Sequence, residues 1–250
     1  MVNFRSILPP SPWKVLPLPA LRKGRAWALL RPDEMVTLYH GTLASYMPSI
    51  RANGLVPSAQ TRSEAMLKFW ASVDEVLLEY GLSRGQLPQR IWEHLEVRWL
   101  EGIEDSEKLE LPPEVNLSFD FDWASLQVLA SLEGVAEIHS VIMEFFRENK
   151  EMVPPGFKIL SREQTFELLR KRACKSGGCV VLTIRMSVGE LGPQWWYYFP
   201  REWNRVKDHP SISTRSRLLE MLFNWNPPTA IRVDPKKIIK LTKVPCVWVG

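Results

Sequence analysis

The chain has 250 residues, of which 45% are apolar and 24% charged, a composition typical of a globular protein rather than a disordered or fibrous one. No window approaches the run of apolar residues that a membrane-spanning helix needs, so we expect no membrane partner. The net charge of +4 is unevenly distributed: residues 196–250 carry ten Lys or Arg against four Asp or Glu, whereas residues 60–113 carry six against eleven. The basic end can attract a nucleic acid or the pyrophosphate of a dinucleotide, although a solvated surface is the simpler interpretation.

The three cysteines are unevenly spaced and form no metal-ligand pattern, so we expect no metal. An odd thiol fits a reducing cytoplasm better than a disulfide framework. Five prolines among the first twenty residues interrupt any apolar run long enough for a signal peptide. These features together predict a cytoplasmic protein, and they leave the oligomeric state open.

Residues 1–34 are Pro-rich and without periodicity, which predicts an extended arm, followed by one domain over residues 35–250. The domain opens with a buried strand at 35–39, then a turn at His40-Gly41-Thr42, a short helix at 43–51 and a stop at Gly54. Gly41 has no side chain, so a ligand can approach its backbone closely. A histidine at the end of a strand, beside a glycine, is well placed to meet a small molecule.

Two acidic segments at 63–80 and 88–101 have apolar residues at helical spacing and are separated by Gly81, Gly85 and Pro88. We interpret this pair of helices, at about 60–113, as an insertion. A short strand at 114–118 and a helix at 123–132 follow it.

Further helices are predicted at 134–152 and 161–171, and Gly177-Gly178 then leads into the clearest strand of the sequence, at 179–186, which has the apolar character of a central strand. The aromatic run at 194–200 is predicted to lie in a loop. It can cover a planar ring or stack on bases, and a hydrophobic plug is an equally good interpretation.

The last informative segment covers residues 213–223 and continues into a Pro-rich link and a closing strand at 226–233. One interpretation is a loop followed by a strand that opens with Glu220. The other is a helix over 213–223 with Glu220 on its surface.

Taken in order, these stretches resemble the three motifs of the ADP-ribosyltransferase-like superfamily. In that superfamily a first strand ends in His-Gly-Thr, a second strand with a small residue, here Ser118, runs into a helix, and a third strand opens with a catalytic Glu. Asn116 occupies the position where the second motif usually carries an aromatic residue, a departure from the branch that uses His, Tyr and Glu. The resemblance implies an α+β fold with a split β-sheet core and inserted helices.

The resemblance also implies that NAD is the substrate and that ADP-ribose is transferred to a macromolecule. Glu220 would be the catalytic carboxylate, because cleavage of the bond between nicotinamide and ribose builds positive charge on the sugar. His40 and Thr42 would hold the far ribose and the Gly41 backbone would pair with the nicotinamide amide. Asn116 and Ser118 would complete the binding site for NAD.

Branches of the superfamily that modify arginine carry Gln or Glu two residues before the catalytic Glu, where this chain has Leu218. Arg215 and Arg217 nearby would repel a guanidinium and attract phosphate. We therefore expect the acceptor to be a nucleic acid or a protein residue other than arginine, as in a toxin or a defence effector.

Two alternatives remain open at this point. RNA 2′-phosphotransferases share the His-Gly-Thr motif, although residues 1–34 are too short for the N-terminal domain of that family. A non-catalytic module that binds a ligand or a nucleic acid would show the same basic ends and aromatic run. For His40 itself, the simpler interpretation is a core histidine whose ring is satisfied by a backbone carbonyl.

Overall fold

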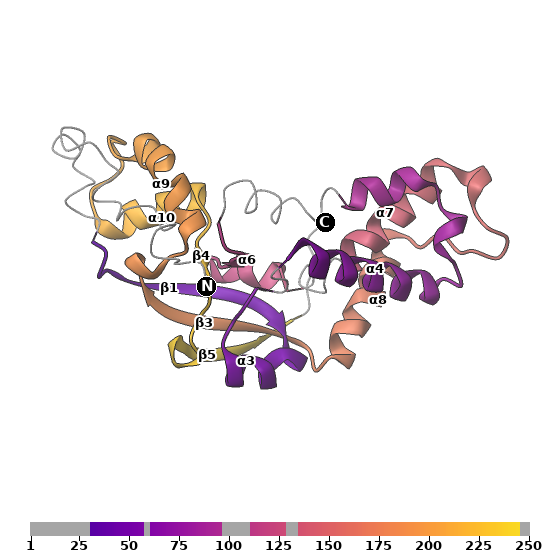
Figure 1. Cartoon of the computed structure of the whole chain (residues 1–250), viewed down its shortest axis with the longest axis horizontal. Coiled ribbons are helices and arrows are strands. Elements are labelled where there is room, and N and C mark those ends of the chain that lie inside the picture. Colours follow the sequence, from indigo (N-terminus) through magenta and orange to yellow (C-terminus); the bar gives the residue numbers. More distant parts are fainter. Residues whose placement is uncertain (1–30, 58–60, 97–110, 129–134, 246–250) are drawn as a thin grey trace.

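The computed structural model describes residues 31–57, 61–96, 111–128 and 135–245, which form an α+β fold (Figure 1). Three antiparallel strands, β1 (Met35–Leu43), β3 (Cys179–Ser187) and β5 (Ile238–Val244), form one sheet in the order β1-β3-β5. Two short strands, β2 (Val115–Asn116) and β4 (Thr229–Ala230), form a second antiparallel sheet. The prediction that 179–186 is a central strand is therefore confirmed.

β1 pairs with β3 along its whole length, from Met35 opposite Ser187 to Leu43 opposite Cys179. Val36 and Leu38 are buried whereas Met35 and Thr37 are exposed, the alternation of period two that defines a strand with two different faces. The predicted strand is confirmed, but it continues through His40, Gly41 and Thr42 instead of turning after residue 39. The predicted turn at these residues is wrong, because β3 pairs with each of them.

The short helix after β1 is confirmed as a 3-10 turn, η3 (Ala44–Tyr46), followed by α3 (Met47–Asn53). Gly54 ends α3 with a φ of 77° and an N–H donated to the carbonyl oxygen of Ile50 at 2.8 Å. This left-handed conformation favours glycine, so the sequence predicted this stop correctly.

A lobe of helices lies to one side of the sheet (right in Figure 1) and contains α4 (Arg62–Glu79), a helical segment at 89–96, α7 (Val135–Glu148) and α8 (Arg162–Lys175). Thr61 caps α4 and Ser161 caps α8, each accepting a backbone N–H three residues later. These helices confirm the helical predictions, although residues 97–101 of the second one lie outside the described part. Whether the acidic pair is an insertion stays a prediction.

α6 (Phe121–Leu126) begins two residues earlier than predicted because Asp120 caps it, accepting the N–H groups of Asp122 and Trp123. Residues 129–132, the end of the predicted helix, lie outside the described part. The remaining 3-10 turns are η4 (Arg84–Gln86), η5 (Lys150–Met152), η6 (Val188–Glu190) and η7 (Pro235–Lys237).

The aromatic run at 194–200 is helical, as the first half of α9 (Pro193–Val206), so the predicted loop is wrong. Trp195, Phe199 and Trp203 recur every four residues and are each fully buried. These buried rings agree better with the interpretation as a hydrophobic plug than with the interpretation as an exposed stacking platform.

Residues around Glu220 form α10 (Arg215–Trp225), so the predicted strand is wrong and the helical alternative is right. Thr214 caps this helix by accepting the N–H of Arg217 at 3.2 Å, and Leu218 and Leu222 are buried one turn apart. The closing strand is reduced to the two residues of β4.

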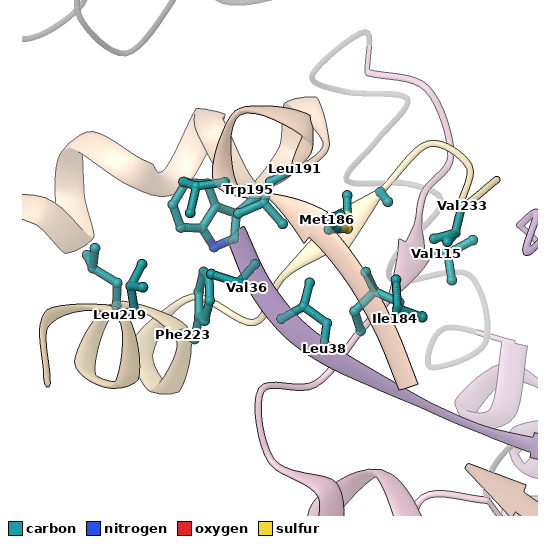
Figure 2. Packing of buried hydrophobic residues seen from close by; sticks show 14 of the residues in the cluster. Val36, Leu38, Val115, Ile184, Met186, Leu191, Trp195, Leu219, Phe223 and Val233 are labelled. Atoms are coloured by element: carbon teal, nitrogen blue, oxygen red, sulfur yellow. The ribbon is translucent and has the colours of Figure 1, made fainter. Parts of the chain in front are cut away.

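One apolar cluster fills the space between one face of the three-stranded sheet and helices α9 and α10. Figure 2 shows Trp195 and Phe223 lying over Val36, with Ile184 and Met186 of β3 farther along the sheet. Asn226 ties the two helices together, because its amide donates to the carbonyl oxygen of Trp195 and its own carbonyl accepts from the Trp195 indole, both at 2.9 Å.

A second apolar cluster joins the other face of the sheet to the helical lobe. β3 contributes Val181 and Cys179 to this cluster, and Leu182 and Ile184 to the first. Its two buried faces explain why this strand is apolar without interruption.

The thiol of Cys174 is exposed and free, whereas Cys179 is disulfide-bonded. The disulfide at Cys179 does not agree with the preference for a reducing compartment over a disulfide framework, because disulfides are more typical of oxidising compartments. Cytoplasmic localisation accordingly stays a prediction. In the described ranges, no helix has the length and apolar character needed to span a membrane, and no cluster of three metal-binding side chains occurs.

Candidate functional site

β1 and the chain around β2 meet at a single residue pair. The N–H of Tyr39 donates to the carbonyl oxygen of Ser118 at 2.7 Å, and the N–H of Ser118 donates back at 2.8 Å. Asn116, two residues earlier, pairs with Thr229 of β4 instead of with β1. The two strands thus part after one contact, and we call the residues at this point the β1–β2 fork: Tyr39, His40, Gly41, Asn116 and Ser118.

His40 links the two arms of the fork through its side chain. Its Nδ1 lies 3.0 Å from the carbonyl oxygen of Asn116, and because a carbonyl only accepts, Nδ1 carries the proton. Burial lowers the pKa of His40, and the hydrogen bond to Asn116 opposes this effect only in part. The ring is therefore neutral at pH 7, and its Nε2 is an acceptor for which no hydrogen bond is recorded among the described residues.

This geometry bears out the simpler interpretation of His40 as a ring satisfied by a backbone carbonyl. It does not conflict with a role in ligand binding, because only one of the two nitrogens is used. The half-buried ring could accept a hydrogen bond from a ligand hydroxyl at Nε2.

Gly41 presents its backbone groups to the open side of the fork. Successive residues of a strand direct their N–H and C=O groups to opposite sides, so Gly41 shares the side that Tyr39 uses to bond Ser118. Asn116, the residue that a continued ladder would place opposite Gly41, pairs with β4. Among the described residues, no hydrogen bond is recorded for the N–H and C=O that Gly41 directs to this side of β1.

The close approach expected at Gly41 is made by α6, not by a ligand. A Cβ on Gly41 would lie 2.1 Å from the carbonyl oxygen of Ala124 and 2.7 Å from Val128 Cγ2. Glycine is thus required for packing of the helix on the strand. Only the peptide edge of Gly41, and not its Cα face, remains a candidate for ligand binding.

Thr42 and Ser118 are less suited to the roles that the sequence suggested. Thr42 is 5% exposed, which leaves almost no surface for a ribose. The Ser118 hydroxyl donates to the carbonyl oxygen of Asp120 at 2.8 Å and accepts the N–H of the same residue at 3.0 Å. Its side chain therefore shapes the turn into α6.

Glu220 lies on α10 and forms an ion pair with Arg217, one turn earlier, at 2.8 Å. No contact between Glu220 and the fork is recorded in the part of the chain that the structure describes. The same helix does approach the fork, since the ring of Phe223 packs on that of Phe119, next to Ser118, with centroids 5.1 Å apart. The third motif is therefore near the second, but it does not reach it as a strand.

Leu218 cannot indicate the class of acceptor, because its side chain is completely buried and cannot face an acceptor. Arg217 is engaged by Glu220. The backbone of Arg215 is part of α10, and its side chain lies outside the described part.

Glu114 is a buried carboxylate that sequence reasoning missed. Its Oε1 accepts the N–H of Gln194 at 2.9 Å, at the start of α9, and a Cβ on Gly192 would lie 2.2 Å from its Oε2. Burial raises the pKa of Glu114, while the nearby Thr229 hydroxyl and the hydrogen bond from Gln194 oppose the rise. The carboxylate caps a helix that is far away in sequence, so no local signal could have found it.

A chain of polar side chains around the buried His139 in the helical lobe was missed as well. Tyr80 Oη lies 2.6 Å from His139 Nδ1, and His139 Nε2 lies 3.4 Å from Glu79 Oε2. Arg172 donates to the other oxygen of Glu79 at 2.9 Å. Contact with His139 is the main influence that lowers the pKa of Glu79, and burial raises the pKa of Tyr80.

Comparisons of the chain with protein-family models, with curated proteins and with solved structures found no match. The function is therefore argued from the fork itself.

Proposed function

We propose that the chain is an NAD-dependent ADP-ribosyltransferase whose NAD-binding site is the β1–β2 fork, and that its two small sheets correspond to the split sheet of the ADP-ribosyltransferase-like fold. The observation that carries the proposal is the pair of backbone groups on Gly41, placed beside a histidine whose Nε2 has no recorded partner in the described part of the chain. Both features follow from the strands parting after Tyr39 and Ser118.

The chemistry of NAD suits these groups. The nicotinamide carboxamide has an N–H donor and a C=O acceptor side by side, which matches the C=O and N–H that a single strand residue directs to one side. The neutral His40 ring accepts a hydrogen bond from a ribose hydroxyl at Nε2. The fork therefore offers a partner for the leaving group and another for a sugar.

The transfer also needs a carboxylate near the reacting ribose, because positive charge develops there as the bond to nicotinamide breaks. In the proposal Glu220 supplies it, after exchanging its ion pair with Arg217 for the ribose 2′-hydroxyl. This exchange is inexpensive, since an exposed ion pair within a helix contributes roughly 0.3–0.5 kcal/mol. The acceptor in this proposal is a macromolecule, either a nucleic acid or a protein side chain other than arginine, a choice that rests on the sequence resemblance alone because Leu218 is buried.

A non-catalytic module that only binds NAD is the second candidate, and the Glu220–Arg217 ion pair favours it. The two candidates predict different results when the purified protein is incubated with NAD. An active transferase releases free nicotinamide, slowly with water and faster with its acceptor, whereas a binding module gives a calorimetric signal without nicotinamide. Absence of both would rule out the fork as an NAD site.

The acceptor can be tested in the same assay by adding labelled NAD with single-stranded RNA or DNA, a mixed protein extract, or an arginine analogue. We expect label on the nucleic acid or on protein. Efficient labelling of the arginine analogue would contradict the proposed acceptor class.

A further inference from the structure

The outer edge of β5 is the side of this strand that faces away from β3 (Figure 1). In the described part of the chain, only β3 pairs with β5. From Lys240 to Val244 this pairing has an unbroken register, so the backbone there is regular and extended, as a further strand requires. A β-bulge lies just before this stretch, where Ile239 has no partner on β3.

The charges along this edge are not compensated by neighbouring carboxylates. Lys240 and Lys243 are exposed, and no ion pair or hydrogen bond of either side chain is recorded in the described ranges. The nearest acidic groups are engaged elsewhere, because Asp234 accepts a backbone N–H within η7 at 2.8 Å and Glu190 is paired with Lys237. The edge is therefore positively charged.

The two lysines flank the edge from opposite faces of the sheet. They are three residues apart in a regular strand, and side chains of a strand alternate between its faces. Ile239 and Leu241 are exposed and belong to neither apolar cluster of the described residues. A strand added here would meet a cation on each face and an apolar side chain between them.

We propose that the outer edge of β5 binds an extended acidic segment of another protein, which joins the sheet as an additional strand. Main-chain hydrogen bonds would hold this segment, and its side chains would provide specificity. In an antiparallel arrangement, the positions opposite Lys243 and Lys240 select Glu or Asp, and the position opposite Leu241 selects an apolar residue. The preferred sequence is thus acidic, any residue, apolar, acidic. A nucleic acid would use the two lysines, but neither the strand edge nor the exposed apolar side chains.

The experiment measures binding of labelled peptides to the full chain by fluorescence anisotropy at low ionic strength. The first peptide is acetyl-Thr-Val-Glu-Thr-Val-Glu-Thr-Val-amide, and a second has Lys in place of each Glu. We expect saturable binding of the first peptide and at least about tenfold weaker binding of the second, because its charges repel those of the edge.

Two N-methylated forms of the first peptide test whether it binds as a strand. Each form carries methyl groups on one of the two alternate sets of backbone amides, and only one set faces β5 in an added strand. One form should therefore bind at least about tenfold more weakly than the other, since it loses main-chain hydrogen bonds to the protein. The unmodified peptide should also slow amide hydrogen exchange in residues 238–244.

Two double variants locate the binding on the protein. Lys240→Gln with Lys243→Gln should weaken binding of the first peptide by roughly fivefold or more, since two cross-strand charge pairs are lost. Lys150→Gln with Lys158→Gln removes the same net charge at exposed positions between α7 and α8, and should leave binding unchanged. The comparisons between peptides use the wild-type protein, so they do not depend on how the variants behave.

Equal affinity of the two N-methylated peptides would overturn the proposal, because an added strand bonds to the sheet through one set of amides only. Tighter binding of oligothymidylate than of the acidic peptide would assign the lysines to a nucleic acid instead. Slower exchange in residues 238–244 at higher protein concentration, without peptide, would assign the edge to a second copy of the chain. The NAD site is tested separately by nicotinamide release, so its failure and that of the β5 edge can be distinguished.

Discussion

For His40, the two ring nitrogens have different tasks, and this difference can be measured. Nδ1 is occupied by Asn116, so a ligand can be bound only through Nε2. His40→Ala should therefore weaken NAD binding by roughly 1–3 kcal/mol, the cost of one buried hydrogen bond and of leaving its partner unpaired. Calorimetry with His94→Ala, the same change at an exposed histidine, provides the control; equal NAD affinity in both variants would show that the ring does not contact NAD.

For Glu220, the expected loss concerns turnover rather than binding. Glu220→Gln should leave NAD affinity nearly intact and lower nicotinamide release by at least about a hundredfold, because a charge-stabilising group is removed from the transition state. Glu167→Gln is a closely matched control, since Glu167 forms an ion pair with Arg170 across the same spacing and with similar exposure. Unchanged release in Glu220→Gln would remove this residue from the mechanism.

Tyr80 has a structural role that can be tested by removing its hydroxyl group. Tyr80→Phe leaves Nδ1 of the buried His139 without its partner, 2.6 Å away in the wild-type protein, so the free energy of unfolding should fall by roughly 1–3 kcal/mol. Urea titration measures this change. Tyr197→Phe, at an exposed position, should change stability little; an equally small effect in Tyr80→Phe would mean that water replaces the phenol.

Among the elements, α6 packs directly on β1 at Gly41, so the position of the helix depends on the absence of a side chain there. Gly41→Ala would drive a methyl group into the Ala124 carbonyl of α6, and the helix must move or the strand must bend. We expect a loss of at least roughly 1–3 kcal/mol in unfolding free energy together with weaker NAD binding. Gly85→Ala, where nothing lies within 4 Å of the added carbon, serves as the control and should be nearly neutral.

Elements defined by local signals could be predicted from the sequence. β3 has a continuous apolar run, and α8 begins at a Ser161 capping box, so both were correctly located. α9 was missed because Trp196, Tyr197 and Tyr198, which are not fully buried, are aromatic as well and hide the four-residue spacing of Trp195, Phe199 and Trp203. α10 has such spacing too, but Glu220 also fitted a motif in which it opens a strand.

The site could be predicted less well than the elements, because it depends on contacts between distant segments. His40 and Asn116 are 76 residues apart, and no local pattern specifies the hydrogen bond between them. The partner of Glu114 is equally remote, at the start of α9. Sequence reasoning named His40 and Gly41, but only the pairing of the strands shows which atoms of these residues are free.

In the molecule as a whole, β3 contributes to both apolar clusters and thereby joins α9 and α10 to the helical lobe. One face of this strand packs on α9 and α10, and the other on α6 and the helical lobe, so neither apolar cluster is complete without it. The NAD site proposed here lies beside this shared sheet, where β1 leaves β3 on one side and meets Ser118 on the other.

β5, described above as the last strand of the sheet, also bears on how this protein avoids self-association. No other strand of the described residues pairs with its outer edge, and Ile239 and Leu241 are exposed, the combination that lets a second chain add a strand. Lys240 lies between these apolar residues and Lys243 follows two residues after Leu241, and both would bring like charges together in any edge-to-edge dimer. Replacing both lysines by threonine should keep the strand and lower solubility, visible as concentration-dependent light scattering, whereas a clear solution of the variant would assign protection of this edge to another feature.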